Sequence, residues 1–205
     1  ADTDGVFIQQ DGGTNGTVQS NRVSDGTITI TSDNSVELDG NAVLSTLAGG
    51  ANGAITITAD NHNDVSGTGT AEIELDAGSR ITAAGGAPIT LSSTGGTITM
   101  GDGATVRSAG GAISVSVGGN AEIALLDAGV ISGGDVTVTS TTGSITDAGA
   151  NVNENIVGDA VTLTAPTGIN IDLNAAGAVT ADSSGANGDI DIEGKLGAII
   201  LETAN

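Results

Sequence analysis

The feature that most constrains this chain is a short alternating run, with aliphatic residues at every second position, that returns along the whole sequence. The earliest copies are residues 6–9 (VFIQ), 28–31 (ITIT) and 55–58 (ITIT). Later copies begin at Ile89, Ile113, Val136, Val161 and Ile190. The imperfect period is about 24 to 26 residues, within the range of solenoid repeats. Alternation of this kind predicts strands with one buried face.

Each period holds two further short runs, separated by glycine-rich corners. The second set begins near Val36, Ile73, Ile98, Ile123, Ile145, Ile169 and Ile199. The third set begins near Val43, Ile81, Val106, Val130, Ile156 and Val179. Glycine marks the bends because it reaches backbone angles closed to other residues. Three strands and three corners per period predict an all-β fold, a parallel β-helix (β-solenoid) of about eight triangular coils, as one domain over residues 1–205.

The same alternation predicts which side chains face the interior. In the first set they are Ile28 and Ile30, Ile55 and Ile57, Ile89 and Leu91, Ile113 and Val115, Val136 and Val138, Val161 and Leu163, and Ile190 and Ile192. Stacked at about 4.8 Å per coil, they would form aliphatic columns in a rod of roughly 40 Å. Since one coil cannot bury its apolar side alone, neighbouring coils must supply the stability.

The outward positions of these runs carry hydroxyl groups in six consecutive copies. They are Thr29, Thr31, Thr56, Thr58, Thr90, Ser92, Ser114, Ser116, Thr137, Thr139, Thr162 and Thr164. Two columns of hydroxyls, about 7 Å apart across and about 4.8 Å apart along the rod, would form a flat lattice. Such Thr-x-Thr arrays resemble those of ice-binding β-solenoids, which implies a surface for ice or for a partner. Threonine is also the commonest outward residue of a solvated strand, so a purely structural role stays open.

Charge restricts the partners of the chain. Asp plus Glu number 25 against 4 Lys plus Arg, a formal net charge of −21. Phosphate contacts need clustered basic residues, so the composition argues against nucleic-acid binding. No stretch approaches the roughly 18–20 apolar residues of a membrane span, which argues against membrane insertion. The absence of Cys excludes disulfides and Cys-ligated metals.

Acidic corners recur along the chain and predict a calcium site. The aspartates concerned are Asp39, Asp76, Asp102, Asp127 and Asp147, each followed by Gly or Ala-Gly. If these corners stack, carboxylates about 5 Å apart would repel one another, and Ca²⁺ would relieve that repulsion. The alternative is that each aspartate caps its own turn through a side-chain oxygen. The glycine-rich nonapeptide of calcium β-rolls is absent.

Two segments lengthen the repeat, residues 59–72 and residues 147–159. Insertions in solenoids emerge as loops on one face, often the binding face, although solvated spacer loops are the commoner explanation. The first segment contains Asp60, His62 and Asp64, a further metal candidate.

The sequence also shows whether the residues needed for an enzyme are present. Enzymatic β-helices that cleave acidic polysaccharides combine carboxylates with a cation, usually beside aromatic rings. The cations here are Arg22, Arg80, Arg107 and Lys195, and the single histidine is His62. No Gly-x-Ser-x-Gly elbow is present. We therefore expect no enzymatic activity, and a polysaccharide-acting enzyme is the weaker alternative.

Residues 133–146 (GGDVTVTSTTGSIT) and 158–169 (GDAVTLTAPTGI) resemble the repeats of filamentous-haemagglutinin-type large exoproteins. That resemblance implies a right-handed parallel β-helix, an extracellular or bacterial cell-surface location, and a role in adhesion or biofilm matrix. It predicts a non-catalytic structural fibre protein. The expected partners are further copies stacked head-to-tail, the continuation of a longer chain, or a host, surface or matrix glycan or protein.

Overall fold

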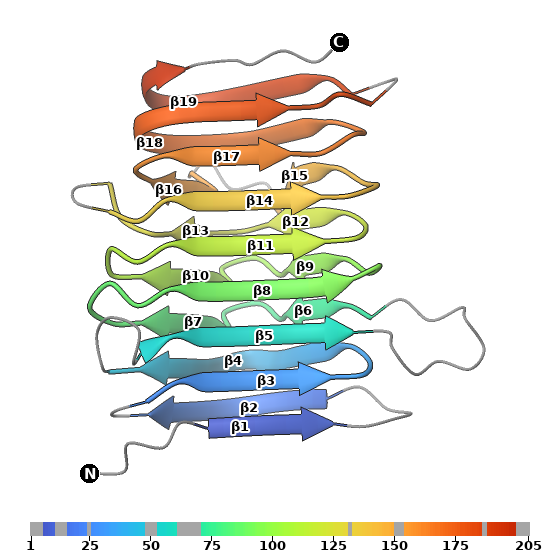
Figure 1. The fold of residues 1–205 in the computed structure, drawn as a ribbon, viewed down its shortest axis with the longest axis vertical. Helices are drawn as coiled ribbons and strands as arrows, with labels where there is room; N and C mark the ends of the chain where they lie inside the picture. Colours follow the sequence, from blue (N-terminus) through green and yellow to red (C-terminus); the bar gives the residue numbers. More distant parts are fainter. Residues whose placement is uncertain are drawn as a thin grey trace.

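A computed structural model describes residues 6–10, 16–23, 26–47, 53–60, 71–130, 133–149, 154–185 and 188–199. Within these ranges every regular element is a β-strand, and the strands pair in parallel. Figure 1 shows them stacked along the long axis, with β1 near one end and β19 near the other. The predicted all-β, parallel class is confirmed. No helix in these ranges has the length and apolar character needed to cross a membrane.

The strands fall into three arrays, because the chain returns to the same position after each passage through them. The first array contains β1 (Val6–Gln10), β3 (Ile28–Ser32), β5 (Ile55–Asp60), β8 (Ile89–Thr94), β11 (Ile113–Val117), β14 (Val136–Ser140) and β17 (Val161–Thr164). It continues into β18 (Ile169–Asp182) and β19 (Ile190–Ile199), where Val161 pairs with Val179 and Val179 with Ile199. One passage through the three arrays is called a layer below.

The second and third arrays are built from shorter segments. The second contains the first parts of β2 (Gly16–Val23) and β4 (Val36–Thr46), then β6 (Ile73–Leu75), β9 (Ile98–Met100), β12 (Ala121–Ile123), β15 (Ile145–Asp147) and the first parts of β18 and β19. The third contains the last parts of β2 and β4, then β7 (Arg80–Ala83), β10 (Thr105–Ser108), β13 (Leu126–Asp127), β16 (Ile156–Gly158) and the middle parts of β18 and β19.

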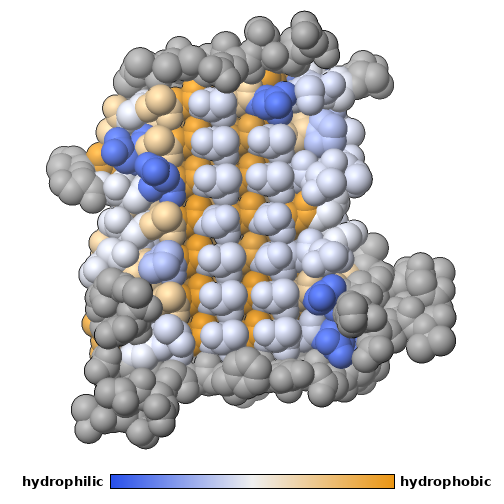
Figure 2. All heavy atoms as spheres, in the orientation of Figure 1, coloured by the Kyte–Doolittle hydropathy of each residue, from blue (hydrophilic) through white to orange (hydrophobic). Residues whose placement is uncertain are grey.

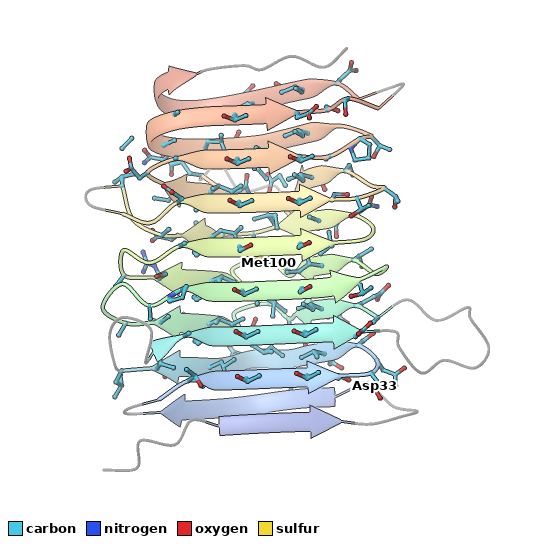
Figure 3. All side chains as sticks on the ribbon, in the orientation of Figure 1. Asp33 and Met100 are labelled. Atoms are coloured by element: carbon cyan, nitrogen blue, oxygen red, sulfur yellow. The ribbon has the colours of Figure 1, made fainter. Side chains whose placement is uncertain are left out.

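The core is a set of aliphatic columns running along the stack. The residues of the first set predicted to face inward, from Ile28 to Leu163, are at most 2% exposed. Met100, labelled in Figure 3, fills the corresponding interior position of the second array and is 1% exposed. Each such side chain contributes about 1.5–3 kcal/mol by leaving water. The predicted inward positions are thus confirmed through Leu163, while Ile190 and Ile192 are partly buried and pack against this core.

Near the C-terminal end, the predicted assignment of runs to sets is wrong. Ile190 pairs with Ile169 in the second array, not with the first set. Val179 lies in the first array, and Leu173 takes the third-array position opposite Ile156. The reason is that β18 and β19 pass through all three arrays without long corners. The repeat therefore shortens to about 18–21 residues. A fixed period of about 24 residues then assigns these runs to the wrong arrays.

Three smaller register predictions are also wrong, by one to four positions. Leu44, not Val43, is the buried partner of Ile81, because consecutive apolar residues in β4 hide the phase of the alternation. Leu126, not Val130, pairs with Val106, because only two residues join β12 to β13. In the second array, Ala121 rather than Ile123 lies opposite Ile98.

Two buried serines, Ser108 and Ser140, close corners and tie their layers to the ones before them. Ser108 Oγ donates to the Ala87 carbonyl oxygen at 2.7 Å and accepts from Gly111 N at 2.8 Å. Ser140 Oγ does the same between the Gly119 carbonyl, at 2.6 Å, and Gly143 N, at 2.9 Å. A Cβ at Gly111 would overlap the Ala87 carbonyl. This Ser-x-x-Gly pattern was readable in the sequence as a corner signal.

Candidate functional site

The clearest candidate surface is the outer face of the first array, called the hydroxyl face below. Strand register places the twelve predicted Thr and Ser residues in two columns. The first column is Thr29, Thr56, Thr90, Ser114, Thr137 and Thr162. The second column is Thr31, Thr58, Ser92, Ser116, Thr139 and Thr164. Both columns are visible as pale stripes between apolar stripes in Figure 2 and as short side chains on the strands in Figure 3.

From β3 to β17 the hydroxyl face carries one kind of polar group. The residues between its columns point inward, as Val115 and Val138 do, each at most 1% exposed. No hydrogen bond joins any of the twelve hydroxyls to another residue in the part of the chain that the structure describes. These hydroxyls are therefore free to bind water or a ligand, in contrast to the buried corner serines.

Sequence reasoning missed one further member of each column. Thr162 pairs with Thr180, and Thr164 pairs with Asp182, so β18 extends the face by one layer. The alternating run at 179–182 was a usable signal, but the period had assigned it to the third set. Asp182 adds a carboxylate where the other members of the second column carry hydroxyls.

The five aspartates predicted to bind calcium do not form one file of stacked carboxylates, so the stacking assumed for that site is wrong. Asp39 and Asp76 do stack, because Asp76 N donates to the carbonyl of Leu38 at 3.0 Å. In the next layer Gly101 takes the stacked position, since Gly101 N donates to the carbonyl of Leu75. Asp102 follows one residue later, at the exposed tip of its corner.

The other two aspartates lie elsewhere. Asp127 is in the third array, opposite Arg107, and its Oδ2 accepts from Arg107 Nη2 at 2.5 Å. Asp147 is in the second array, opposite the buried Ile123. Both cap their own turns: Asp127 Oδ1 accepts from Gly129 N at 2.9 Å, and Asp147 Oδ1 accepts from Gly149 N at 3.0 Å. The alternative reading, an aspartate closing its own corner, is what these two side chains do.

Asp147 also belongs to a buried polar cluster centred on Asn155, which is 1% exposed. Asn155 Nδ2 donates to Asp147 Oδ1 at 2.8 Å, to the Ile123 carbonyl at 2.9 Å and to the Ala124 carbonyl at 3.2 Å. Its Oδ1 accepts from Asp172 N at 3.1 Å. The amide therefore binds three successive layers at the corner between the second and third arrays.

An acidic patch lies on the outer face of the second array, near β4 and β6. Glu37 lies directly opposite Glu74, with Glu72 and Asp76 beside it in β6 and its corners. Partial desolvation, then the carboxylates of Asp76, Glu37 and Glu72, raise the pKa of Glu74. Like charges opposite one another destabilise a strand pair, so this patch is a point of local strain.

The structure describes only some of the remaining predicted site residues. Asp60 ends β5 opposite Thr94, whereas His62 and Asp64 lie outside the described residues, as do 61–70 and 150–153 of the two long segments. Within the described ranges, no group of three or more acidic or histidine side chains is arranged to hold a metal ion.

Comparisons with protein families, curated proteins and solved structures find no match for this chain. The resemblance to filamentous-haemagglutinin-type repeats stays a prediction.

Proposed function

We propose that this chain is a non-catalytic section of an extracellular bacterial fibre, folded as a right-handed parallel β-helix and used in adhesion or biofilm matrix. The observation that carries the proposal is the uniform parallel register of the first array. From β3 to β17, residues at the same position in every strand are partners, with one face buried and the other covered by hydroxyls. Such a body suits a stiff spacer that presents repeated contacts.

Assembly into a longer fibre is part of the proposal. Among the described strands of the first array, β1 pairs only with β3, and the segment of β19 pairs only with β18. In general, an unpaired edge at the end of a solenoid is a template for further parallel pairing. Either the continuation of a chain or a second copy would satisfy it, and head-to-tail contacts that do not close give open fibres.

Negative-stain microscopy and small-angle scattering of the purified chain test the rod. We expect particles about 40 Å long along the stacking axis, or filaments whose length grows with protein concentration. Compact spheres with no preferred axis would contradict the proposal.

Binding of the purified chain to bacterial cells and to matrix glycans tests adhesion. Thr137→Glu places a charge in the middle of the hydroxyl face, and Thr82→Glu places the same charge on the third array, where its partners Ser45 and Arg107 are not carboxylates. We expect Thr137→Glu to weaken binding and Thr82→Glu to leave it unchanged, with similar melting temperatures. Equal binding by both variants would exclude the hydroxyl face as the contact surface.

A second candidate function is binding to ice, favoured by the two columns of hydroxyls without protein partners. Their spacing of about 4.8 Å along and about 7 Å across is regular enough to order a layer of water. An ice-recrystallisation assay separates this function from adhesion. Thr137→Val retains the shape but removes a hydroxyl, and Thr82→Val on the third array is its control. Absence of any effect of the unmodified chain on ice would remove this candidate.

A further inference from the structure

A hollow opens on the second array near its C-terminal end, away from the hydroxyl face. Outward residues of three consecutive layers stack there, since Thr146 pairs with Asn170 and Asn170 pairs with Asp191. Three further polar residues, Ser144, Thr167 and Asp189, also line it, together with Gly168 and Ile169. Its volume is about 360 Å³. Small-molecule pockets span about 300–1,000 Å³, so the hollow has room for a small ligand or one unit of a polymer.

Gly168 lies in the lining of the hollow. Its φ of +135° is a conformation that side chains rarely adopt, so the position between Ser144 and Asp189 carries no side chain. The backbone around it is held by ladder bonds: Ile169 N donates to the Asp189 carbonyl at 2.8 Å, and Ile145 N donates to the Gly168 carbonyl at 3.0 Å. A floor made of paired strands holds the lining side chains in a fixed arrangement.

The side chains that line the hollow determine which class of ligand it can bind. Hydroxyls and the Asn170 amide both donate and accept hydrogen bonds, whereas the carboxylates of Asp189 and Asp191 only accept them. Among the side chains that the structure describes, none that lines the hollow is cationic, and the chain carries a net charge of −21. Anionic ligands are therefore repelled, and an apolar ligand would leave these polar groups without partners. A ligand that is rich in hydroxyl groups and carries an ammonium group can bind both sets of lining groups. Its hydroxyls pair with the hydroxyl and amide groups, and its ammonium group pairs with the carboxylates.

We propose that this hollow is a binding subsite for one unit of an amino-sugar polymer with free amines. The hydroxyls of the sugar bind Ser144, Thr146 and Asn170, and its ammonium group lies between Asp189 and Asp191. The inference deepens the adhesive function proposed above and rests on it. One subsite binds weakly, but repetition of the same section along a fibre multiplies the contacts and raises the overall avidity.

Calorimetric titration of the purified chain with the glucosamine tetramer tests the subsite, with the N-acetylglucosamine tetramer and a galacturonic acid tetramer as comparison ligands. We expect the glucosamine tetramer to bind most tightly and the acidic tetramer not to bind. Equal affinity for the acetylated tetramer, tighter binding of the acidic one, or no binding of any would overturn the proposal.

Two matched variants separate the subsite from general charge attraction. Asp191→Asn and Glu122→Gln each remove one carboxylate from the outward column of the second array, but only Asp191 lines the hollow. We expect Asp191→Asn to weaken binding at least about tenfold and Glu122→Gln to change it less than about twofold. Equal losses would show that the attraction is nonspecific. Titration with CaCl₂ alone provides a further check: calcium binding that Asp191→Asn abolishes would reassign the hollow to a cation.

The two proposals fail in distinguishable ways. If the tetramer does not bind but the particles are rods that adhere through the hydroxyl face, only the subsite is wrong. If the tetramer binds at Asp191 but the purified chain forms compact spheres that adhere to nothing, the fibre proposal is wrong.

Discussion

The first array and the corner between the second and third arrays obey different rules. In the first array, strands from β3 to β17 repeat one register, and their first four positions alternate aliphatic and hydroxyl side chains in every strand. At the corner, β6 and β7 are joined by four residues, β12 and β13 by two, and β15 and β16 by eight. Register is imposed by ladder hydrogen bonds and buried columns, which every layer must share. Corners meet no such requirement, so their lengths and contents vary.

The fate of the candidate site residues follows from this difference. The twelve hydroxyls lie in columns because they sit on strands whose register is common to all layers. The five aspartates scatter because they sit at or beside corners of unequal length. Asp127 follows a corner of two residues and falls in the third array, and Asp147 precedes a corner of eight and stays in the second. Sequence periodicity therefore predicts aligned columns of side chains on strands better than at corners.

The largest effect is expected from a charge inside the first array. Val138 is 0% exposed and lies between Val115 and Leu163. Val138→Asp should lower the free energy of unfolding by about 3–5 kcal/mol, because an unpaired carboxylate enters an aliphatic column. Thr137→Asp, the neighbouring outward position, should cost less than about 1 kcal/mol. Denaturant unfolding measures both, and equal costs would mean that the inward and outward faces are not distinct.

A smaller effect is expected at the corner. Asn155→Ala removes three donated bonds and leaves Asp172 N without its side-chain acceptor. We expect a loss of about 2–3 kcal/mol in the free energy of unfolding, because buried polar groups lose their partners. The control is Asn170→Ala at an exposed position, with an expected change within about 0.5 kcal/mol. If the two variants unfold alike, the corner does not depend on Asn155.

The smallest effect is expected from the acidic patch. The raised pKa of Glu74 means that the folded chain binds its proton more tightly than the unfolded chain does. Its ionised form therefore destabilises the fold at pH 7, and this cost disappears as the pH falls through the raised pKa toward the ordinary value of 4.5. Glu74→Gln should raise stability at pH 7 by about 0.2–1 kcal/mol, the range for directly opposed side chains. Melting temperatures between pH 4 and 7, at low salt, measure the difference.

Glu122→Gln is the control for that experiment, because Glu122 lies opposite Thr99 and Thr146 rather than a second carboxylate. Its effect should be smaller at pH 7 and should not depend on pH in the same way. A stabilisation by Glu74→Gln that persists unchanged at pH 4 would show that its cause is packing and not charge.

Much of the molecule was predictable from short-range pattern. The parallel class, the inward residues from Ile28 to Leu163 and the two hydroxyl columns follow from alternation and β-branched composition. The array that each part of β18 and β19 joins was not predictable, because their corners shorten without changing the alternation. The hollow at Gly168 was not predictable either, since it depends on which residues of three layers lie side by side.

By itself, the sequence determined the strand faces, because a period of two is a local property that survives any arrangement of the corners. Only the tertiary structure decided which distant residues meet: the buried amide of Asn155 across three layers, the separation of Asp127 from Asp76, and the alignment of Thr146, Asn170 and Asp191. The physical reason is that these meetings depend on corner length. Hydrogen bonds and packing between layers select that length jointly, and no single repeat encodes it.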